Sequence, residues 1–213
     1  MRYIIISLTL LIGCMHDTLA SNRCLEPTPH RCTTDSVHFF FTDITGTLRE
    51  IIIPSHYAYK PMTEGLVFDG SSVPGYRSVD ESDQPLIPEP ATSGYLRVHE
   101  EPQAYVFCDA TDSDEAFTTD SRTILKNAVT RAQENGFTMS VGAEIEFFLM
   151  NPDGSPADTF GYCQACNDAH FYDIMQDLVI FLKDNNIPAE KMHKEVGAGQ
   201  YEIVLNHADP VKM

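Results

Sequence analysis

The stretch "VGAEIEFFLM", Val141–Met150, has the apolar content of a buried strand but contains two acidic residues, Glu144 and Glu146. Side chains alternate between the two faces of a strand, so both carboxylates lie on one face while Ile145 and Phe147 lie on the other. Two like charges on one partly buried face repel each other unless a proton, solvent or a cation compensates them. The stretch therefore predicts a strand whose acidic face needs a partner.

A second segment has the same pattern. The sequence "HKEVGAGQYEIV", His193–Val204, contains Glu195, a Gly-Ala-Gly turn and then Glu202 in another apolar strand. Gly197 and Gly199 allow a tight turn that brings Glu195 close to Glu202. Carboxylate oxygens are preferred ligands of Mg²⁺ and Mn²⁺. Two hypotheses stay open at this point, a divalent-metal site and the solvated polar face of an amphipathic sheet. The residues concerned are Glu144, Glu146, Glu195 and Glu202.

The composition excludes one class of function. The 213 residues are enough for one large domain or two small ones. Asp and Glu number 31 against 14 Lys and Arg, which gives a formal net charge of -17. A nucleic-acid-binding protein needs a basic face to neutralise phosphates, so we expect no nucleic-acid partner. An acidic protein can still act on anions when bound divalent metals supply the positive charge.

The first part of the chain has the pattern of a small mixed sheet. Val37–Thr42 and Leu48–Ile53 predict a hairpin around a turn at Asp43–Thr47. The stretch "GLVFDGSSVPGY" is predicted as a glycine-marked loop, and "DESDQPLIPEP" as a polar, proline-rich, non-helical segment. Ala104–Ala110 predicts a further strand, and we expect this sheet to end near Ala116.

The rest of the chain alternates helices and strands. A helix is predicted after a cap at Asp120 or Ser121 and ends near Asn135. A second amphipathic helix is predicted from Asp168 to Asn185. The segments "MHKEVGAGQ" and "YEIVLN" close the chain. The pattern predicts an α+β protein in two parts.

Residues 1–20 have the pattern of a leader. Arg2 precedes an apolar run, Tyr3–Gly13, that is too short for a membrane-spanning helix and fits the hydrophobic region of an export signal. Two processing sites fit: the lipoprotein-like box "LIGC", which ends at Cys14, and "TLA", Thr18–Ala20. The alternative is a buried hydrophobic segment. A membrane association is expected only if the leader is a lipoprotein signal.

Residues 21–35 are rich in Pro, Thr and Cys and are predicted as a linker. Cys24 and Cys32 both lie within it and can form a disulfide in an oxidising compartment. Cys163 and Cys166 form a single C-x-x-C without a second pair or a histidine at zinc-finger spacing. We therefore expect two ordinary, mostly buried thiols rather than a zinc site.

Several stretches together resemble a known family. Between about Val37 and Asp209, the chain is similar to the N-terminal half of glutamine synthetase, specifically the bacterial type I enzyme. The matching stretches are "FFFTDITGTLREIIIP", "EGLVFDGSSVPGYRSVDESDQPLIPEPAT", "GAEIEFFLM", the Gly161-Tyr162 pair with the helix after it, and "HKEVGAGQYEI". The resemblance implies a β-grasp-like domain at residues 36–116. It also implies the start of an α/β catalytic domain at residues 117–213.

The resemblance also implies an activity and a site. The family condenses glutamate with ammonia, driven by ATP, through a γ-glutamyl phosphate, and uses two Mg²⁺ or Mn²⁺ ions. Glu146, Glu195 and Glu202 match the ligands of the glutamate-side metal, and Glu144 matches a ligand of the ATP-side metal. Asp69 in "FDGSS" matches the aspartate that a neighbouring subunit inserts to bind ammonium and help deprotonate it. The family is a cytoplasmic homo-oligomer with active sites between subunits.

The chain departs from the family in several places. It stops at Met213, so the resemblance implies that the ligands completing the ATP-side site and the phosphate-binding arginines are absent. Lys194 stands where the family usually has His, and His193 and His207 lie outside the family's metal-binding His segment. The leader is foreign to the family, which favours an upstream extension or a secondary acquisition. We also expect the interrupted sheet to expose apolar surface and an unpaired edge.

These departures leave two alternatives to a glutamine synthetase. One is a non-catalytic remnant, exported or lipid-anchored, that binds a metal or a partner subunit. The other is a γ-glutamyl-amine ligase of the same superfamily, because the amine-pocket residues beyond Asp69 lie largely outside this stretch.

Overall fold

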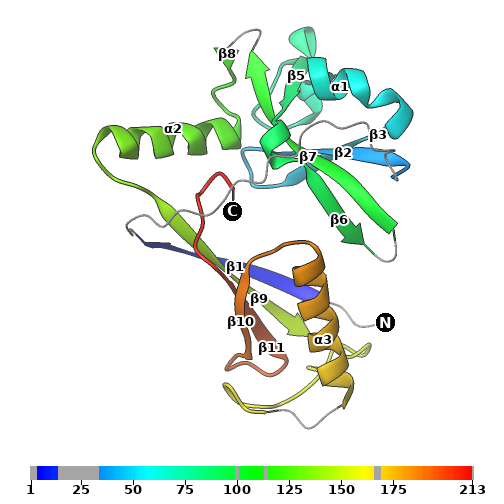
Figure 1. The fold of residues 1–213 in the computed structure, drawn as a ribbon, viewed down its shortest axis with the longest axis vertical. Helices are drawn as coiled ribbons and strands as arrows, with labels where there is room; N and C mark the ends of the chain where they lie inside the picture. The colour runs from blue at the N-terminus through cyan, green and yellow to red at the C-terminus, as the bar shows by residue number, and fades with distance from the viewer. Residues whose placement is uncertain (1–3, 14–33, 99–100, 113–114, 166–168, 213) are drawn as a thin grey trace. The chain divides into compact units, whose positions relative to one another are not determined.

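The computed structural model describes residues 4–13, 34–98, 101–112, 115–165 and 169–212 (Figure 1). It divides the chain into two compact units. The first unit is His16–Gly136, and the second unit is Met1–Met15 together with Phe137–Met213. Within the described residues, no helix is long and apolar enough to span a membrane.

The first unit is built on a seven-stranded mixed sheet with the strand order β3-β2-β7-β5-β4. Strands β6 and β8 also pair with β7. β2 runs parallel to β7, and the other pairs are antiparallel. The strands are β2 (Ser36–Thr42), β3 (Leu48–Pro54), β4 (Leu66–Asp69), β5 (Asp83–Pro88), β6 (Gly94–Val98), β7 (Glu101–Asp112) and β8 (Glu115–Ala116).

Two α-helices and four short 3-10 turns complete the first unit. Helix α2 begins after Asp120, whose carboxylate accepts a hydrogen bond from the backbone N–H of Thr123, so the predicted cap is confirmed. The α-helices are α1 (Tyr59–Glu64) and α2 (Ser121–Glu134). The 3-10 turns are η1 (Ser55–Tyr57), η2 (Gly70–Ser72), η3 (Val79–Glu81) and η4 (Pro90–Thr92).

Helix α2 belongs to the first unit because it carries two cations into an ion-pair cluster there. Arg122 and Lys126 each pair with both Glu89 and Asp109, at distances of 2.5 to 2.9 Å. The division between the compact units therefore falls after Gly136, whereas the sequence predicts a domain limit at 116/117.

The core of the first unit follows the alternation of β2. Val37, Phe39 and Phe41 point inward and are buried, and Phe41 packs against Phe68 with ring centroids 4.8 Å apart. The other buried members of this cluster are Ala58, Leu86, Val106, Cys108, Ala110 and Phe117.

Strands β4 and β5 form in segments that the sequence predicts to be loop-like. β4 lies within the predicted glycine-marked loop, and β5 lies within the proline-rich segment. The two strands pair antiparallel, with Phe68 opposite Gln84. Gln84 is fully buried, and its amide donates a hydrogen bond to the carbonyl of Thr111. The prediction is wrong here because pairing with distant segments stabilises these strands, whereas their local composition resembles a loop.

The second unit has a four-stranded antiparallel sheet in the order β1-β9-β11-β10, with helix α3 packed on one face (Figure 1). The elements are β1 (Ile4–Gly13), β9 (Ser140–Leu149), α3 (Ala169–Asp184), β10 (Ala189–Lys194) and β11 (Gln200–Leu205). Odd-numbered residues of β9 and β11 form the core beneath α3. Its buried members are Ala143, Phe147, Leu149, Leu182, Tyr201, Ile203 and Leu205.

The apolar N-terminal run forms a strand in the structure. β1 pairs antiparallel with β9 along its whole length, from Ile4 opposite Leu149 to Gly13 opposite Ser140. A run rich in β-branched residues readily adds to an open strand edge. The predicted processing sites at Cys14 and Thr18–Ala20 lie outside the described residues, as does nearly all of the predicted linker.

Two of the six cysteines can be compared with the sequence prediction. Cys108 is fully buried, but Cys163 is exposed, so the prediction of a buried thiol is wrong at Cys163. Cys163 adopts a φ of 53° in a surface loop, and this turn directs the residue away from the core. Cys14, Cys24, Cys32 and Cys166 lie outside the described residues.

The β2–β3 hairpin turn is organised by one buried carboxylate. Asp43 accepts hydrogen bonds from the backbone N–H groups of Thr45 and Thr47 and from the hydroxyl of Thr45, and it forms an ion pair with Arg49 at 2.8 Å. These bonds, led by the Thr45 hydroxyl, lower the pKa of Asp43 from 3.8 to about 2, against the opposing effect of burial.

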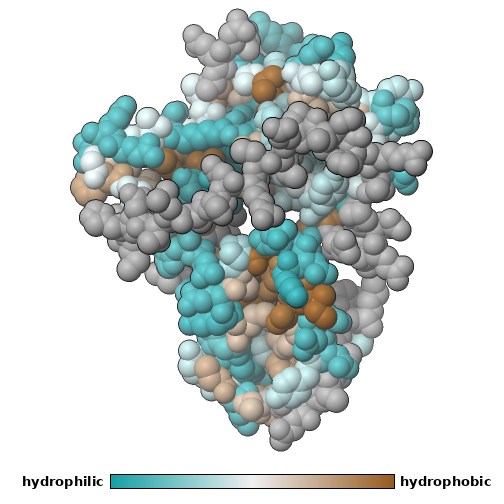
Figure 2. All heavy atoms as spheres, in the orientation of Figure 1, coloured by the Kyte–Doolittle hydropathy of each residue, from teal (hydrophilic) through white to brown (hydrophobic). Residues whose placement is uncertain are grey.

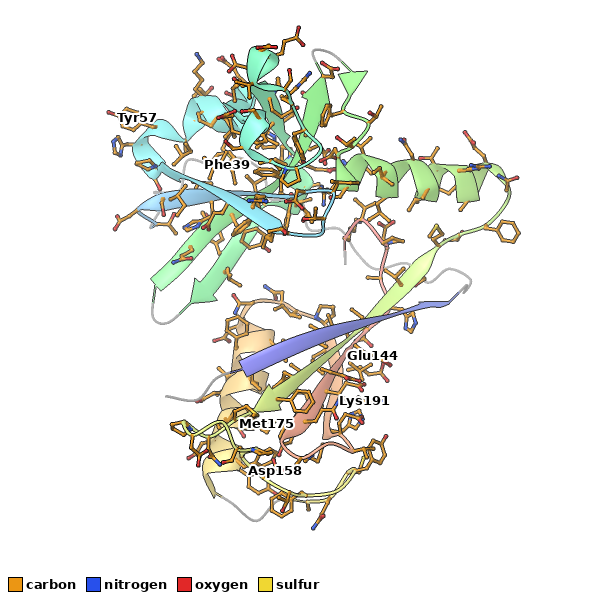
Figure 3. The ribbon with its side chains drawn as sticks, turned by 180° about the vertical axis from the view of Figure 1, so that it is seen from behind. Phe39, Tyr57, Glu144, Asp158, Met175 and Lys191 are labelled. Atoms are coloured by element: carbon orange, nitrogen blue, oxygen red, sulfur yellow. The ribbon has the colours of Figure 1, made fainter. Side chains whose placement is uncertain are left out.

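We expect Phe39→Ala to lower the free energy of unfolding of the first unit by about 3–5 kcal/mol, because it leaves a cavity in a closed core. The matched control is Tyr57→Ala, since Tyr57 is 69% exposed in the same unit and should change this free energy by less than about 0.5 kcal/mol (Figure 3). Chemical denaturation followed by circular dichroism measures both. Equal losses in the two variants would contradict this description of the core.

We expect Asp43→Asn to destabilise the protein at neutral pH and to matter less in acid. The folded-state pKa of Asp43 lies below its unfolded value, so its stabilising contribution is present above pH 3.8 and is lost as the pH falls towards about 2. The measurement is the unfolding free energy of both proteins between pH 7 and pH 2. A difference that stays constant across this range would contradict the assignment.

Candidate functional site

The register of the second unit aligns three acidic or basic side chains across three strands. Glu202 of β11 lies directly opposite Glu146 of β9 on one side and opposite His193 of β10 on the other. Glu144 lies two residues along β9, opposite Val204, on the same face as Glu146. These side chains occupy the face of the sheet opposite to α3, whose Met175 belongs to the core (Figure 3).

Three of the side chains on this face are close enough to share an ion. One ligand atom from each of His193, Glu195 and Glu202 lies within 4.8 Å of the others. His193 Nε2 is 3.0 Å from Glu195 Oε1. Two carboxylates and an imidazole are a donor set that suits a divalent transition metal.

Glu202 is the buried member of this group. Its exposed fraction is 8%, and no Lys or Arg of the described residues forms an ion pair with it. Burial raises the pKa of the Glu202 carboxyl, and so does repulsion from Glu144, Glu195 and Glu146, whereas His193 lowers it. The other three predicted carboxylates therefore all act on Glu202. The buried, unpaired carboxylate and the surrounding donors fit a bound cation, which would relieve the repulsion.

Glu146 is held by a different contact. Its Oε2 accepts a hydrogen bond from Gln200 Nε2 at 3.0 Å. The Gln200 side chain also accepts a hydrogen bond from the backbone N–H of Gly197 at 3.1 Å. Gln200 thus links Glu146 to the turn that carries Glu195.

The turn between Glu195 and Gly199 is held from beneath by Lys194. The Lys194 ammonium is buried and donates to the backbone carbonyls of Glu195, at 2.8 Å, and of Gly197. It also lies 3.7 Å from Asp158 and 5.3 Å from the ring centroid of Tyr201. Lys194 therefore faces the core side of the sheet and fixes the backbone that presents Glu195.

Gly199 is required by this turn. Its φ is +69°, in the left-handed region, and a Cβ atom there would lie 2.6 Å from the carbonyl oxygen of Leu149. Any other residue would strain the turn and collide with β9.

Sequence reasoning missed His193 as a member of the group. It assigned this histidine no role, because the expected ligands came from a family resemblance. The available signal was the spacing of His193 and Glu195, which are two residues apart on one strand and so share a face. The closeness of His193 to Glu202 could not be seen, because it depends on the β10–β11 register.

Asp69 lies in the first unit and caps the short turn η2. Its carboxylate accepts hydrogen bonds from the backbone N–H and hydroxyl of Ser71 and from the hydroxyl of Ser72. The Ser71 hydroxyl is the main cause that lowers the pKa of Asp69. Asp69 is therefore an ionised carboxylate at neutral pH, presented by a loop.

A groove lies between α3 and β10 in the second unit. It has a volume of about 660 Å³ and is lined mainly by apolar side chains, among them Met175, Val179 and Leu182. Figure 2 shows apolar surface over α3, where Val179 and Ile180 are about half exposed. β10 is an edge strand among the described strands.

Comparison with known proteins gives the family. The model of the glutamine synthetase beta-Grasp domain matches residues 33–113, and the model of the glutamine synthetase catalytic domain matches residues 118–213. The chain belongs to the glutamine synthetase family. The predicted fold class is confirmed: an α+β chain with a β-grasp domain followed by part of the catalytic domain of this ligase family.

Curated glutamine synthetases from several organisms are similar to this chain. That of Halobacterium salinarum is 35% identical over 185 residues, which cover 82% of this chain and 41% of the relative. That of Mycolicibacterium smegmatis is 36% identical over 189 residues, which cover 83% of this chain and 42% of the relative. The chain therefore spans less than half the length of these relatives.

Solved structures share the fold. A structure described as a GmaS/ADP complex matches with a TM-score of 0.72 at 24% identity, over 84% of this chain and 43% of that one. A cryo-EM structure of Plasmodium falciparum glutamine synthetase matches with a TM-score of 0.71 at 20% identity, over 84% of this chain and 42% of that one.

We expect Lys194→Met to lower the free energy of unfolding of the second unit by about 1–3 kcal/mol, because it leaves the carbonyls of Glu195 and Gly197 without their buried donor. Lys191→Met is the matched control: Lys191 is exposed on the same strand, and the change should stay within about 0.5 kcal/mol. Denaturant unfolding gives both values. If Lys194→Met unfolded like the control, the proposed support of the turn would be wrong.

Proposed function

We propose that this chain carries the ammonium-binding and glutamate-side residues of a glutamine synthetase. The reaction is the ATP-dependent ligation of ammonia to L-glutamate through a γ-glutamyl phosphate. The observation that supports it best is the convergence of Glu144, Glu146, Glu195 and Glu202 on one face of the sheet, where burial and then the charges of the other three raise the pKa of Glu202.

The carboxylate face has a clear physical task in this reaction. Glutamate and ATP are both anions, and an acidic face repels them unless cations intervene. Glu146, Glu195 and Glu202 would hold one Mg²⁺ or Mn²⁺ ion and Glu144 would contribute to a second, and these ions would supply the positive charge that phosphoryl transfer needs. The residues of this chain bind and orient these groups: Gln200 orients Glu146, and Lys194 fixes the turn that presents Glu195.

Asp69 suits the recognition of ammonium. A carboxylate with a lowered pKa stays charged and attracts a cation, and three hydrogen bonds from Ser71 and Ser72 hold it in place. The same hydrogen bonds weaken Asp69 as a base. We therefore assign Asp69 first to binding ammonium and second to helping its deprotonation. In the proposed assembly, Asp69 of one subunit serves a neighbouring copy in a homo-oligomer.

The test is formation of ¹⁵N-glutamine from ¹⁵N-ammonium, glutamate and ATP by the full chain, followed by mass spectrometry. We expect the product to depend on ATP and on Mg²⁺ or Mn²⁺, and Glu202→Gln to lower its rate by about 100-fold or more. Glu190→Gln is the matched control, because Glu190 is an exposed glutamate of β10 outside the acidic group.

Two results would overturn the proposal. A chain that is folded by circular dichroism but forms no ¹⁵N-glutamine is not a glutamine synthetase by itself. A faster reaction with methylamine than with ammonium would assign the chain to the γ-glutamyl-amine ligases of the superfamily.

A further inference from the structure

We propose that Asp158 is a positioning residue of the proposed glutamate-side metal site. It holds the ammonium of Lys194 in the core, and Lys194 holds the turn that presents Glu195. The inference rests on the proposed function, because Glu195 is a metal ligand there. Among the described residues, Asp158 forms its hydrogen bonds and ion pair with Phe160, Lys194 and Tyr201, and none with a proposed ligand. Asp158 therefore acts on the site through Lys194.

The Asp158 carboxylate is buried in the loop that follows β9 (Figure 3). Its side chain is 9% exposed. The Oδ1 atom accepts a hydrogen bond from the backbone N–H of Phe160 at 3.0 Å, and Oδ2 accepts one from the hydroxyl of Tyr201 at 2.5 Å. Tyr201 is itself part of the core beneath α3. Each carboxylate oxygen is thus held by its own donor, and the orientation of the group is fixed.

Lys194 is a buried cation whose charge Asp158 compensates. The Lys194 side chain is 4% exposed, and its Nζ atom lies 3.7 Å from Asp158 Oδ1. Within the described part of the chain, Asp158 is the only acid that pairs with Lys194. The hydrogen bonds of Nζ go instead to the carbonyls of Glu195 and Gly197. A buried ion without its counter-ion is strongly destabilised. Loss of the Asp158 charge therefore loosens Lys194 and, with it, both carbonyls of the turn.

The loop that carries Asp158 is attached to both neighbouring strands. The backbone N–H of Ala157 donates a hydrogen bond to the carbonyl of Leu149, at the end of β9, at 2.8 Å. The backbone N–H of Cys163 donates to the carbonyl of Lys194, at the end of β10, at 3.0 Å. Asp158 lies between these two anchors. Because both anchors are backbone bonds, a substitution at Asp158 tests the side chain and leaves the path of the loop intact.

The position of the turn matters because metal coordination tolerates little displacement. The ligand oxygens of Mg²⁺ lie ~2.1 Å from the ion. Groups that orient a ligand from behind change metal affinity by about 10- to 100-fold when they are removed. Lys194 is such a group for Glu195, and Asp158 is one contact further from the ion. We therefore expect the effect of Asp158 at the lower end of this range.

The first test is calorimetry of Mn²⁺ binding to the full chain. Asp158→Asn keeps the shape of the side chain, removes its charge and should weaken Mn²⁺ binding by about 10-fold. Asp153→Asn is the matched control, since Asp153 is an exposed aspartate of the same loop whose carboxylate accepts hydrogen bonds from Ser155. Tyr201→Phe removes one donor to Asp158 and should weaken Mn²⁺ binding by about 3-fold. This variant carries the test if Asp158→Asn does not fold.

Two further measurements separate positioning from a general loss of stability. Amide hydrogen exchange of residues 195–200 in the metal-free protein should be faster in Asp158→Asn, while exchange of α3 should stay unchanged. The second measurement is a double-mutant cycle. Because Asp158 acts through Lys194, the double variant Asp158→Asn, Lys194→Met should bind Mn²⁺ no more weakly than Lys194→Met alone.

Three results would contradict the inference in different ways. Unchanged Mn²⁺ affinity in a folded Asp158→Asn protein would overturn it and leave the proposed metal site intact. Additive losses in the double variant would show that Asp158 does not act through Lys194 and would also overturn it. An unaltered protein that binds no Mn²⁺ would overturn both the inference and the proposed metal site.

Discussion

The antiparallel register between β9 and β11 is the constraint on which the second unit depends. It places Glu202 opposite Glu146, while the neighbouring odd-numbered residues enter the core beneath α3. A slip by one residue would bury the carboxylates against α3 and expose the aromatic core. The apolar face therefore determines the pairing, and the pairing gathers charges that repel one another. Burial, and after it this repulsion, raise the pKa of Glu202.

The polar residues around the acidic face have separate tasks. Lys194 is buried on the core side, and its ammonium binds the carbonyls of the turn rather than neutralising the glutamates. Gln200 binds Glu146 and the same turn from the acidic side. The two side chains fix the backbone between Glu195 and Gly199 from opposite faces. Neither side chain neutralises the charge of the acidic group, so a bound cation is needed to compensate it, in keeping with the proposed metal site.

Parts of the fold could be predicted because their signals are local. The alternation of Val37, Phe39 and Phe41 identifies β2, and Asp120 caps α2 through a hydrogen bond within one turn of chain. Strands β4 and β5 could not be predicted in this way. β4 is only four residues long and lies between Gly65 and Gly70, and β5 contains two prolines and two polar residues. They become strands because they pair with each other and because β5 pairs with β7.

In the candidate site, too, some features follow from the local sequence and others only from the tertiary structure. The sequence by itself determined that Glu144 and Glu146 share one face and that Glu195 precedes a glycine turn, since side-chain alternation and backbone freedom are properties of the local chain. Only the tertiary structure decided which side chains meet. The proximity of His193 to Glu202, and the direction of Lys194 into the core, follow from strand order and register. These are set by the burial of apolar surface from segments far apart in the sequence.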